Sequence, residues 1–122
     1  MKILADENIP KVRELFSDHA SVKTFQGRDL TAADLEDIDV LLVRSITEVN
    51  EALLAGTNVK FVGTATIGMD HIDKIWLQKQ GIGFANAPGC NAIAVAEYVL
   101  SGLFLISTKF NLDLRTCKVG IL

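Results

Sequence analysis

Residues 39–63 read DVLLVRSITEVNEALLAGTNVKFVG and contain a complete strand–helix–strand pattern. The segment DVLLVR (39–44) is apolar enough for a strand that is buried on both faces of a sheet. EVNEALLAG (48–56) predicts a short helix ended by its final glycine, and VKFVG (59–63) predicts the next strand. Because the connections are short, we expect the two strands to lie parallel, joined by a right-handed crossover.

The same alternation of strand and helix continues on both sides of this unit. Further strands are predicted at KILA (2–5), SVKTF (21–25) and IGFA (82–85). Helix starts are expected at Pro10, at Thr31 with Asp34 as a capping box, and at Asp70 with Asp73 as its third-position acid. The repeat predicts an α/β fold of flavodoxin-like type, a doubly wound parallel sheet with helices on both faces.

The composition is that of an ordinary globular chain without a strong charge bias. Its 122 residues are 49% hydrophobic, and 12 basic against 15 acidic residues give a net charge of −3. This balance leaves no electrostatic footprint for nucleic acid or an anionic membrane, so neither is expected as a partner. Cys90 and Cys117 form no CxxC pair and are expected to be reduced thiols of a cytoplasmic protein. The start, MKILADEN, becomes charged too early for a signal peptide.

A long apolar segment, AIAVAEYVLSGLFLIS (92–107), interrupts the alternation and predicts a helix from Asn91 to about Thr108. It is shorter than the roughly 20 residues of a membrane span and carries Glu97 near its middle. A buried or interface helix that needs a partner is therefore favoured. After a polar break, KVGIL (118–122) has the pattern of a buried parallel strand that begins a second unit.

Ligands of an open parallel sheet bind where its strands end, so the loops there are the candidate site. The loops after the first, third, fourth and fifth strands are Asp6-Glu7-Asn8, Arg44-Ser45-Ile46-Thr47, GTATIG (63–68) and Asn86-Ala87-Pro88-Gly89-Cys90-Asn91. GTATIG is the most informative, because small residues and hydroxyls let a ligand approach the backbone N–H groups, which favours an anion. Arg44 and Ser45 could add a forked cation and a hydroxyl. Ordinary strand-end turn chemistry remains an equal alternative on pattern alone.

Other chemically interesting residues have simpler interpretations. His71 lies at a predicted helix start without a partner motif, so a surface or capping role is favoured over a general base. Asp70 and Asp73 are interpreted as caps and not as metal ligands. A carboxylate of Asp6-Glu7 is expected to cap the helix that follows, in preference to binding a cation. Cys90 is interpreted as a loop or packed thiol and not as a nucleophile.

Two other function classes can be weighed against an anion-binding enzyme domain. A phosphoacceptor receiver domain has a similar size and fold, but it needs an aspartate where this chain has Arg44-Ser45 and a lysine where it has Asn86-Ala87-Pro88. The interpretation as a receiver domain therefore largely fails. A non-catalytic module that uses the apolar helix to bind a partner remains open.

Four segments resemble the D-2-hydroxyacid dehydrogenase superfamily: MKILADENIP (1–10), VRSITEVNEALL (43–54), KFVGTATIGMDHID (60–73) and GIGFANAPGCNAIAVAEYV (81–99). Within it they are similar to members that act on 4-phospho-D-erythronate. The resemblance implies a homodimeric enzyme of pyridoxal phosphate biosynthesis. It would oxidise this small phosphorylated hydroxy acid to 2-oxo-3-hydroxy-4-phosphobutanoate with NAD as hydride acceptor.

The resemblance also implies a division of the chain. Residues 1–90 would form the substrate-binding domain, 91–110 a connecting helix, and 111–122 the start of a Rossmann domain that ends before the GxGxxG loop. Substrate contacts of the family carry over to Ser45 and Thr66, and Arg44 is added from its position. The family's catalytic arginine, glutamate and histidine and its NAD-binding loop are expected outside these 122 residues, so no catalytic, cofactor-binding or metal residue is assigned. The 122-residue chain alone is predicted to be inactive.

Overall fold

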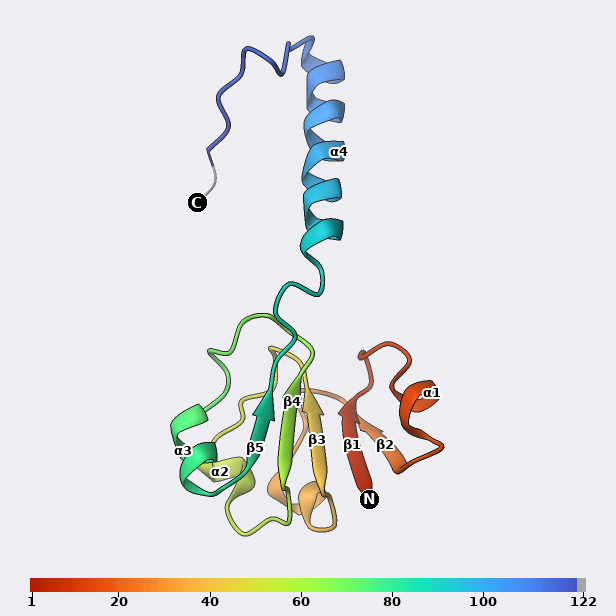
Figure 1. Cartoon of the computed structure of the whole chain (residues 1–122), viewed down its shortest axis with the longest axis vertical. Coiled ribbons are helices and arrows are strands. Elements are labelled where there is room, and N and C mark those ends of the chain that lie inside the picture. Colours follow the sequence, from red (N-terminus) through yellow and green to blue (C-terminus); the bar gives the residue numbers. More distant parts are fainter. Residues whose placement is uncertain (121–122) are drawn as a thin grey trace. The chain divides into compact units, whose positions relative to one another are not determined.

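A computed structural model describes residues 1–120 of the chain, which divides into two compact units, Met1–Pro88 and Gly89–Leu122. The first unit is built on one five-stranded parallel sheet with the strand order β2-β1-β3-β4-β5 (Figure 1). Its strands are β1 (Lys2–Asp6), β2 (Ser21–Phe25), β3 (Val40–Val43), β4 (Phe61–Thr64) and β5 (Gly83–Ala85). This is the flavodoxin-like order, so the predicted fold class is confirmed.

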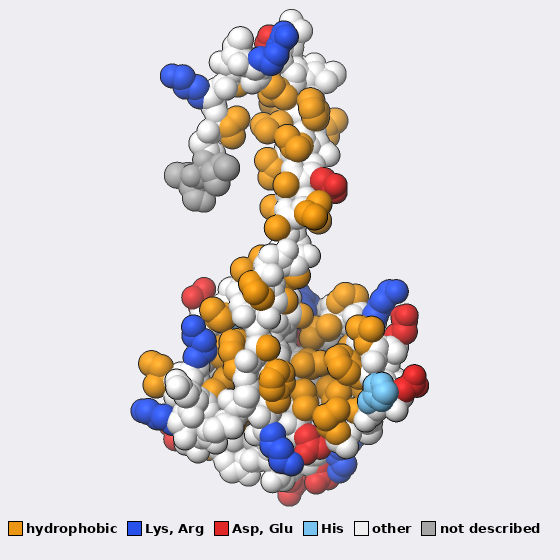
Figure 2. Space-filling view, viewed as in Figure 1, with side chains coloured by type: hydrophobic (Ala, Val, Ile, Leu, Met, Phe, Trp, Pro, Cys, Tyr) orange, Lys and Arg blue, Asp and Glu red, His pale blue; other side chains and the backbone are white. Residues whose placement is uncertain are grey.

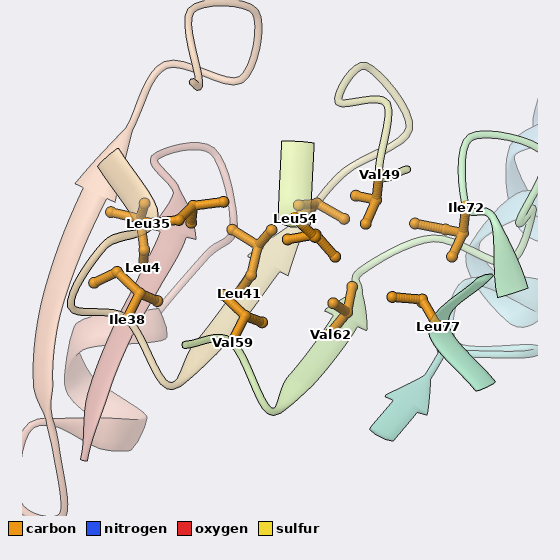
Figure 3. Packing of buried hydrophobic residues seen from close by; sticks show 11 residues of the cluster. Leu4, Leu35, Ile38, Leu41, Val49, Leu54, Val59, Val62, Ile72 and Leu77 are labelled. Carbon is orange, nitrogen blue, oxygen red and sulfur yellow. The ribbon is translucent and has the colours of Figure 1, made fainter. Parts of the chain in front are cut away.

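Four short helical elements connect the strands: α1 (Val12–Phe16), the 3₁₀ turn η1 (Ala32–Leu35), α2 (Glu51–Leu54) and α3 (Lys74–Lys79). The core lies between one face of the sheet and η1, α2 and α3. There Leu41 and Val62 of the central strands meet Leu54 and Leu77 of the helices (Figure 3). All four side chains are buried, so this layer supplies most of the hydrophobic stabilisation of the unit.

The opposite face of the sheet is less covered, because α1 packs mainly against β2, at the edge of the sheet. Alternate residues show the difference: Leu41 is buried, whereas Leu42 is half-buried and Phe61 is 37% exposed. Figure 2 shows hydrophobic side chains gathered on the first unit. Helical elements therefore lie on both faces of the sheet, as predicted, but they cover one face more fully than the other.

Two cross-strand pairs fit a large side chain against a glycine on this less covered face. Leu42 lies opposite Gly63, and Phe61 lies opposite Gly83. A Cβ atom added to Gly63 would lie 2.8 Å from Leu42 Cδ2, and one added to Gly83 would lie 2.8 Å from Phe61 Cδ2. Each large side chain thus occupies the space that its glycine leaves open.

Two predicted helix starts are wrong. The first helix begins at Val12 and not at Pro10, because Lys11 has a left-handed backbone (φ 58°) and the chain still turns there. The cap of α3 is Asp73 and not Asp70: the Asp73 carboxylate accepts a hydrogen bond of 2.9 Å from the backbone N–H of Trp76. This contact satisfies a backbone donor that the first turn of a helix leaves free.

Other local predictions are confirmed. Thr31 and Asp34 form the capping box, although on a 3₁₀ turn, and the hydrogen bonds from Thr31 hold the pKa of Asp34 below its usual value. Gly56 and Gly81 follow α2 and α3 with positive φ angles of 77° and 70°, which glycine adopts without strain.

The second unit consists of the single helix α4 (Ala92–Phe110) and the segment after it. Its helix ends at Asn111, whose left-handed backbone (φ 50°) places its N–H on the Ser107 carbonyl. No residue of α4 is buried, and Tyr98 and Ile93 are 80% and 77% exposed. By length and composition alone, α4 could also cross a membrane, a criterion that the core helix of a water-soluble protein meets as well.

The predicted strand KVGIL is not formed in the part that the structure describes. Residues 111–120 adopt turns and coil, and Ile121 and Leu122 lie outside the described residues. Asp113 forms a 2.8 Å ion pair with Arg115, which holds the pKa of the Asp113 carboxyl below its usual value. The assignment of this segment to a Rossmann domain stays a prediction.

Candidate functional site

The loops after β3 and β4 lie side by side because the two strands end in register, with Val43 opposite Thr64. Ser45 follows β3 and Thr66 follows β4, each two residues beyond the end of its strand. A cavity of about 440 Å³ opens between the loops and is lined by Ser45, Glu48, Thr66, Gly68, Asp70 and His71. The structure thus brings together two of the three predicted site residues.

The loop that carries Ser45 is held in place by hydrogen bonds of Thr47. The buried Thr47 hydroxyl donates a 2.7 Å hydrogen bond to the carbonyl of Gly27, in the loop after β2. The Thr47 N–H also bonds to the Arg44 carbonyl at 3.2 Å and closes a tight turn around Ser45. This turn holds the Ser45 backbone at the cavity while its side chain stays exposed to a ligand.

The GTATIG loop is held by contacts with both neighbouring strand ends. The Ala65 N–H bonds to the Val43 carbonyl at 2.9 Å, and the Asn86 side-chain amide bonds to the Ile67 carbonyl at 3.1 Å. Within residues 1–120, the backbone N–H groups of Thr66, Ile67 and Gly68 have no protein acceptor. Such free donors in a loop of small residues can bind an anion, as the sequence predicted.

His71 is one of the residues that the sequence analysis placed wrongly. It is only 6% exposed, and its Nε2 lies 3.0 Å from the Thr64 hydroxyl. An isolated parallel bridge between Val49 and Ile72 draws the segment inward, with the Val49 N–H bonded to the His71 carbonyl at 2.8 Å. His71 therefore forms part of the cavity wall and is not a surface or capping residue. The apolar residues at 49 and 72 are the only sequence signal of this bridge.

Arg44 lies next to this cavity but is not among the residues that line it. Its guanidinium Nη1 is 3.7 Å from Oδ1 of Asp6, a carboxylate that is completely buried at the end of β1. Asp6 does not cap α1: its Oδ1 accepts a 2.8 Å hydrogen bond from the Asn8 N–H, in the turn before that helix. The Arg44 side chain remains 35% exposed, so it is partly accessible to an anionic ligand.

Charge inside the cavity does not uniformly favour an anion. Glu48 and Asp70 are both exposed carboxylates on its wall. They repel a negatively charged group and accept hydrogen bonds from hydroxyl groups. The cavity therefore combines backbone N–H donors of the GTATIG loop with the carboxylate acceptors of Glu48 and Asp70. This mixture suits a ligand that carries both acidic groups and hydroxyls.

Two further features of the described residues bear on the site. Cys90 is exposed in the loop before α4, in agreement with a loop thiol. In the described part of the chain, no three His, Cys, Asp or Glu side chains are grouped as they would be around a metal ion. A second cavity, of about 430 Å³, lies along β1, β2 and η1 and contains none of the predicted site residues.

A sequence profile of the family described as "D-isomer specific 2-hydroxyacid dehydrogenase, catalytic domain" matches residues 3–114. The chain belongs to this family. Curated 2-hydroxyacid dehydrogenases also match over its whole length. Erythronate-4-phosphate dehydrogenase of Serratia proteamaculans is 57% identical over 122 residues, and that of Klebsiella pneumoniae is 58% identical over 121 residues. These matches cover 100% and 99% of the chain but 33% and 32% of the relatives, so the chain spans about a third of their length.

Solved structures of the family share the fold. The NAD⁺-bound 3-phosphoglycerate dehydrogenase of Entamoeba histolytica superposes with a TM-score of 0.68 at 27% identity, over 83% of this chain and 37% of that one. The D-lactate dehydrogenase of Aquifex aeolicus, complexed with NAD and lactic acid, gives a TM-score of 0.70 at 21% identity, over 98% and 39%. The first unit is therefore a domain of the 2-hydroxyacid dehydrogenase type.

Proposed function

We propose that this chain is the substrate-binding portion of an NAD-dependent dehydrogenase that oxidises 4-phospho-D-erythronate to 2-oxo-3-hydroxy-4-phosphobutanoate. The observation that carries the proposal is the identity of 55–58% to curated erythronate-4-phosphate dehydrogenases, among them those of Serratia and Klebsiella, along essentially the entire chain. This reaction would belong to pyridoxal phosphate biosynthesis, in a cytoplasmic homodimer.

The site supports a role in binding and orienting the substrate. The substrate carries a carboxylate, two hydroxyls and a phosphate, and the loops after β3 and β4 offer complementary groups. Ser45 and the free N–H groups of the GTATIG loop would bind polar and anionic parts, and the partly exposed Arg44 would attract an anionic end. Thr66 completes the set of substrate contacts. Fixing the substrate in one orientation is the contribution that these residues can make to rate.

NAD would supply the hydride acceptor when bound. The 122 residues contain no GxGxxG segment, which is the element that holds a dinucleotide pyrophosphate in a Rossmann domain. We therefore assign no NAD contact to this chain and predict that the chain alone forms no NADH.

A chimaera tests the proposal directly. In it, this chain replaces the matching third of the Serratia enzyme, and NADH formation from 4-phospho-D-erythronate is followed by absorbance. We expect turnover by the chimaera and none by the 122-residue chain. Ser21→Ala, at the other end of the sheet, serves as a control variant and should leave turnover unchanged. A folded chimaera without activity would contradict the proposal.

A non-catalytic binding module is the second candidate function. The exposed apolar side chains of α4, none of which is buried, favour it, because such a surface is usually covered by a partner. Activity of the chimaera decides between the two, since a binding module has no reason to complete a dehydrogenase site.

A further inference from the structure

A chain of hydrogen bonds joins His71 and Thr66, which both line the cavity, through the buried Thr64. His71 Nε2 lies 3.0 Å from the Thr64 hydroxyl, and that hydroxyl lies 2.7 Å from the Thr66 hydroxyl. The Thr66 hydroxyl in turn donates to the carbonyl of Gly68 at 3.1 Å. His71 and Thr64 are only 6% and 4% exposed, so the first two members are shielded from water.

The direction of donation along this chain follows from its last member. A carbonyl oxygen only accepts, so the single proton of the Thr66 hydroxyl is used on Gly68. Thr66 must then accept from Thr64, which uses the proton of Thr64 as well. Thr64 has to accept from His71, and this requires a proton on Nε2 of the imidazole.

This polarity determines what Thr66 can offer to a ligand. With its proton donated to Gly68 and one lone pair occupied by Thr64, Thr66 presents its remaining lone pair to the cavity. The carboxylates of Glu48 and Asp70 line the same cavity and also accept hydrogen bonds. The side chains on this wall therefore favour a hydrogen-bond donor over a phosphate or carboxylate.

We propose that His71 is a positioning residue that fixes Thr66 as a hydrogen-bond acceptor, and that Thr66 binds the hydroxyl at C3 of the substrate. The second part rests on the proposed function. In the reaction C2 transfers its own hydrogen as hydride to the nicotinamide and the C2 hydroxyl gives up its proton to a base, so the C3 hydroxyl is the non-reacting donor that remains. Thr66 would then distinguish this substrate from 2-hydroxy acids that lack a C3 hydroxyl.

The tautomer of His71 can be measured on the 122-residue chain without any substrate. Nitrogen-15 NMR of the imidazole separates a protonated ring nitrogen from a bare one. We expect the neutral ring of His71 to carry its proton on Nε2, and the exposed His19 serves as an internal reference. A neutral His71 with a bare Nε2 would overturn the direction of the chain, because Thr64 would then be the donor.

The C3 contact is tested in the chimaera by combining a variant with a substrate analogue. Thr66→Val should raise KM for 4-phospho-D-erythronate about three- to tenfold, as the loss of one neutral hydrogen bond predicts. For 2-hydroxy-4-phosphobutanoate, which lacks the C3 hydroxyl, the same variant should leave KM unchanged. An equal increase of KM for both substrates would overturn the assignment, because Thr66 would then bind a group that the two share.

Two further variants separate positioning from a purely structural role. His71→Leu should raise KM for the substrate but not for the 3-deoxy analogue, and His71→Gln, which restores an N–H donor, should recover most of the loss. Thr57→Val serves as a control, since its hydroxyl bonds to the Leu54 carbonyl away from the cavity. An inactive chimaera would overturn the proposed function and the C3 assignment together, whereas the NMR result judges the role of His71 independently.

Discussion

The loop after β4 and the helix α4 are both poor in charge, yet they differ in whether their side chains are buried. His71 of the loop is buried and hydrogen-bonded to the buried Thr64 at the end of β4, whereas no residue of α4 is buried. The loop belongs to a unit with its own core, and α4 does not. The comparison teaches that apolar composition alone does not stabilise a segment, because burial against other elements supplies the free energy.

The largest expected difference between the two regions lies in their response to truncation of a leucine. Leu41→Ala, in the core of the first unit, should lower the free energy of unfolding by about 2–5 kcal/mol. Leu105→Ala, at a position of α4 that is 73% exposed, should change it by less than about 0.5 kcal/mol. Urea unfolding of the dilute chain measures both. Similar losses in the two variants would mean that α4 is packed in solution as tightly as the core.

A smaller contrast is expected from adding one methyl group to a glycine in each region. At Gly27 a Cβ would lie 2.4 Å from Asp6 Oδ2 and 2.8 Å from Ile46 Cδ1, so Gly27→Ala should destabilise the first unit by about 1–3 kcal/mol. At Gly102 in α4 nothing lies within 4 Å, and Gly102→Ala should increase helix content. Thermal unfolding followed by circular dichroism measures both effects. A stable Gly27→Ala variant would show that Asp6 and Ile46 can move aside.

The regular parts of the fold were predictable because they depend on neighbouring residues in the sequence. The apolar run at 39–44 and the glycines that end α2 and α3 specify their elements locally. The burial of His71 and the pairing of Arg44 with Asp6 depend on contacts between distant segments. Local patterns carry little information about such contacts, so these site features could not be predicted.

Ser45 and Thr66 illustrate the middle case. Each lies two residues beyond a strand that the sequence predicted, and parallel strands in register bring such positions to the same edge. The position of the site was therefore predictable from the fold. The preference of its side chains for a donor or an acceptor was not, because it depends on the partners of Thr64 inside the unit.

The smallest expected contrast concerns acid. Asp39 accepts hydrogen bonds from the Lys2 backbone N–H at 2.9 Å and from Lys60 Nζ at 3.2 Å, and these hold its pKa below the ordinary 3.8. Its stabilisation is therefore complete above about pH 3.8 and is lost as the pH falls through the lower folded-state value. Asp39→Asn should make the free energy of unfolding less dependent on pH in this acidic range.

The pKa of Asp113 in the second unit is also lowered, but by a partner two residues away. Such a local contact can persist in the unfolded chain, so Asp113→Asn should alter the acid dependence less than Asp39→Asn. Unfolding curves at a series of pH values compare the two variants. A larger effect at Asp113 would show that the segment after α4 has a folded structure of its own.

The pairing of Leu42 with Gly63 and of Phe61 with Gly83 has a consequence for how such sequences diverge. Since a Cβ atom added to either glycine would lie 2.8 Å from the large side chain opposite, neither member of a pair can change size freely. A related sequence with a larger residue at position 63 or 83 must therefore carry a smaller residue at the position opposite. These two pairs should therefore stand out as covarying positions when related sequences are aligned.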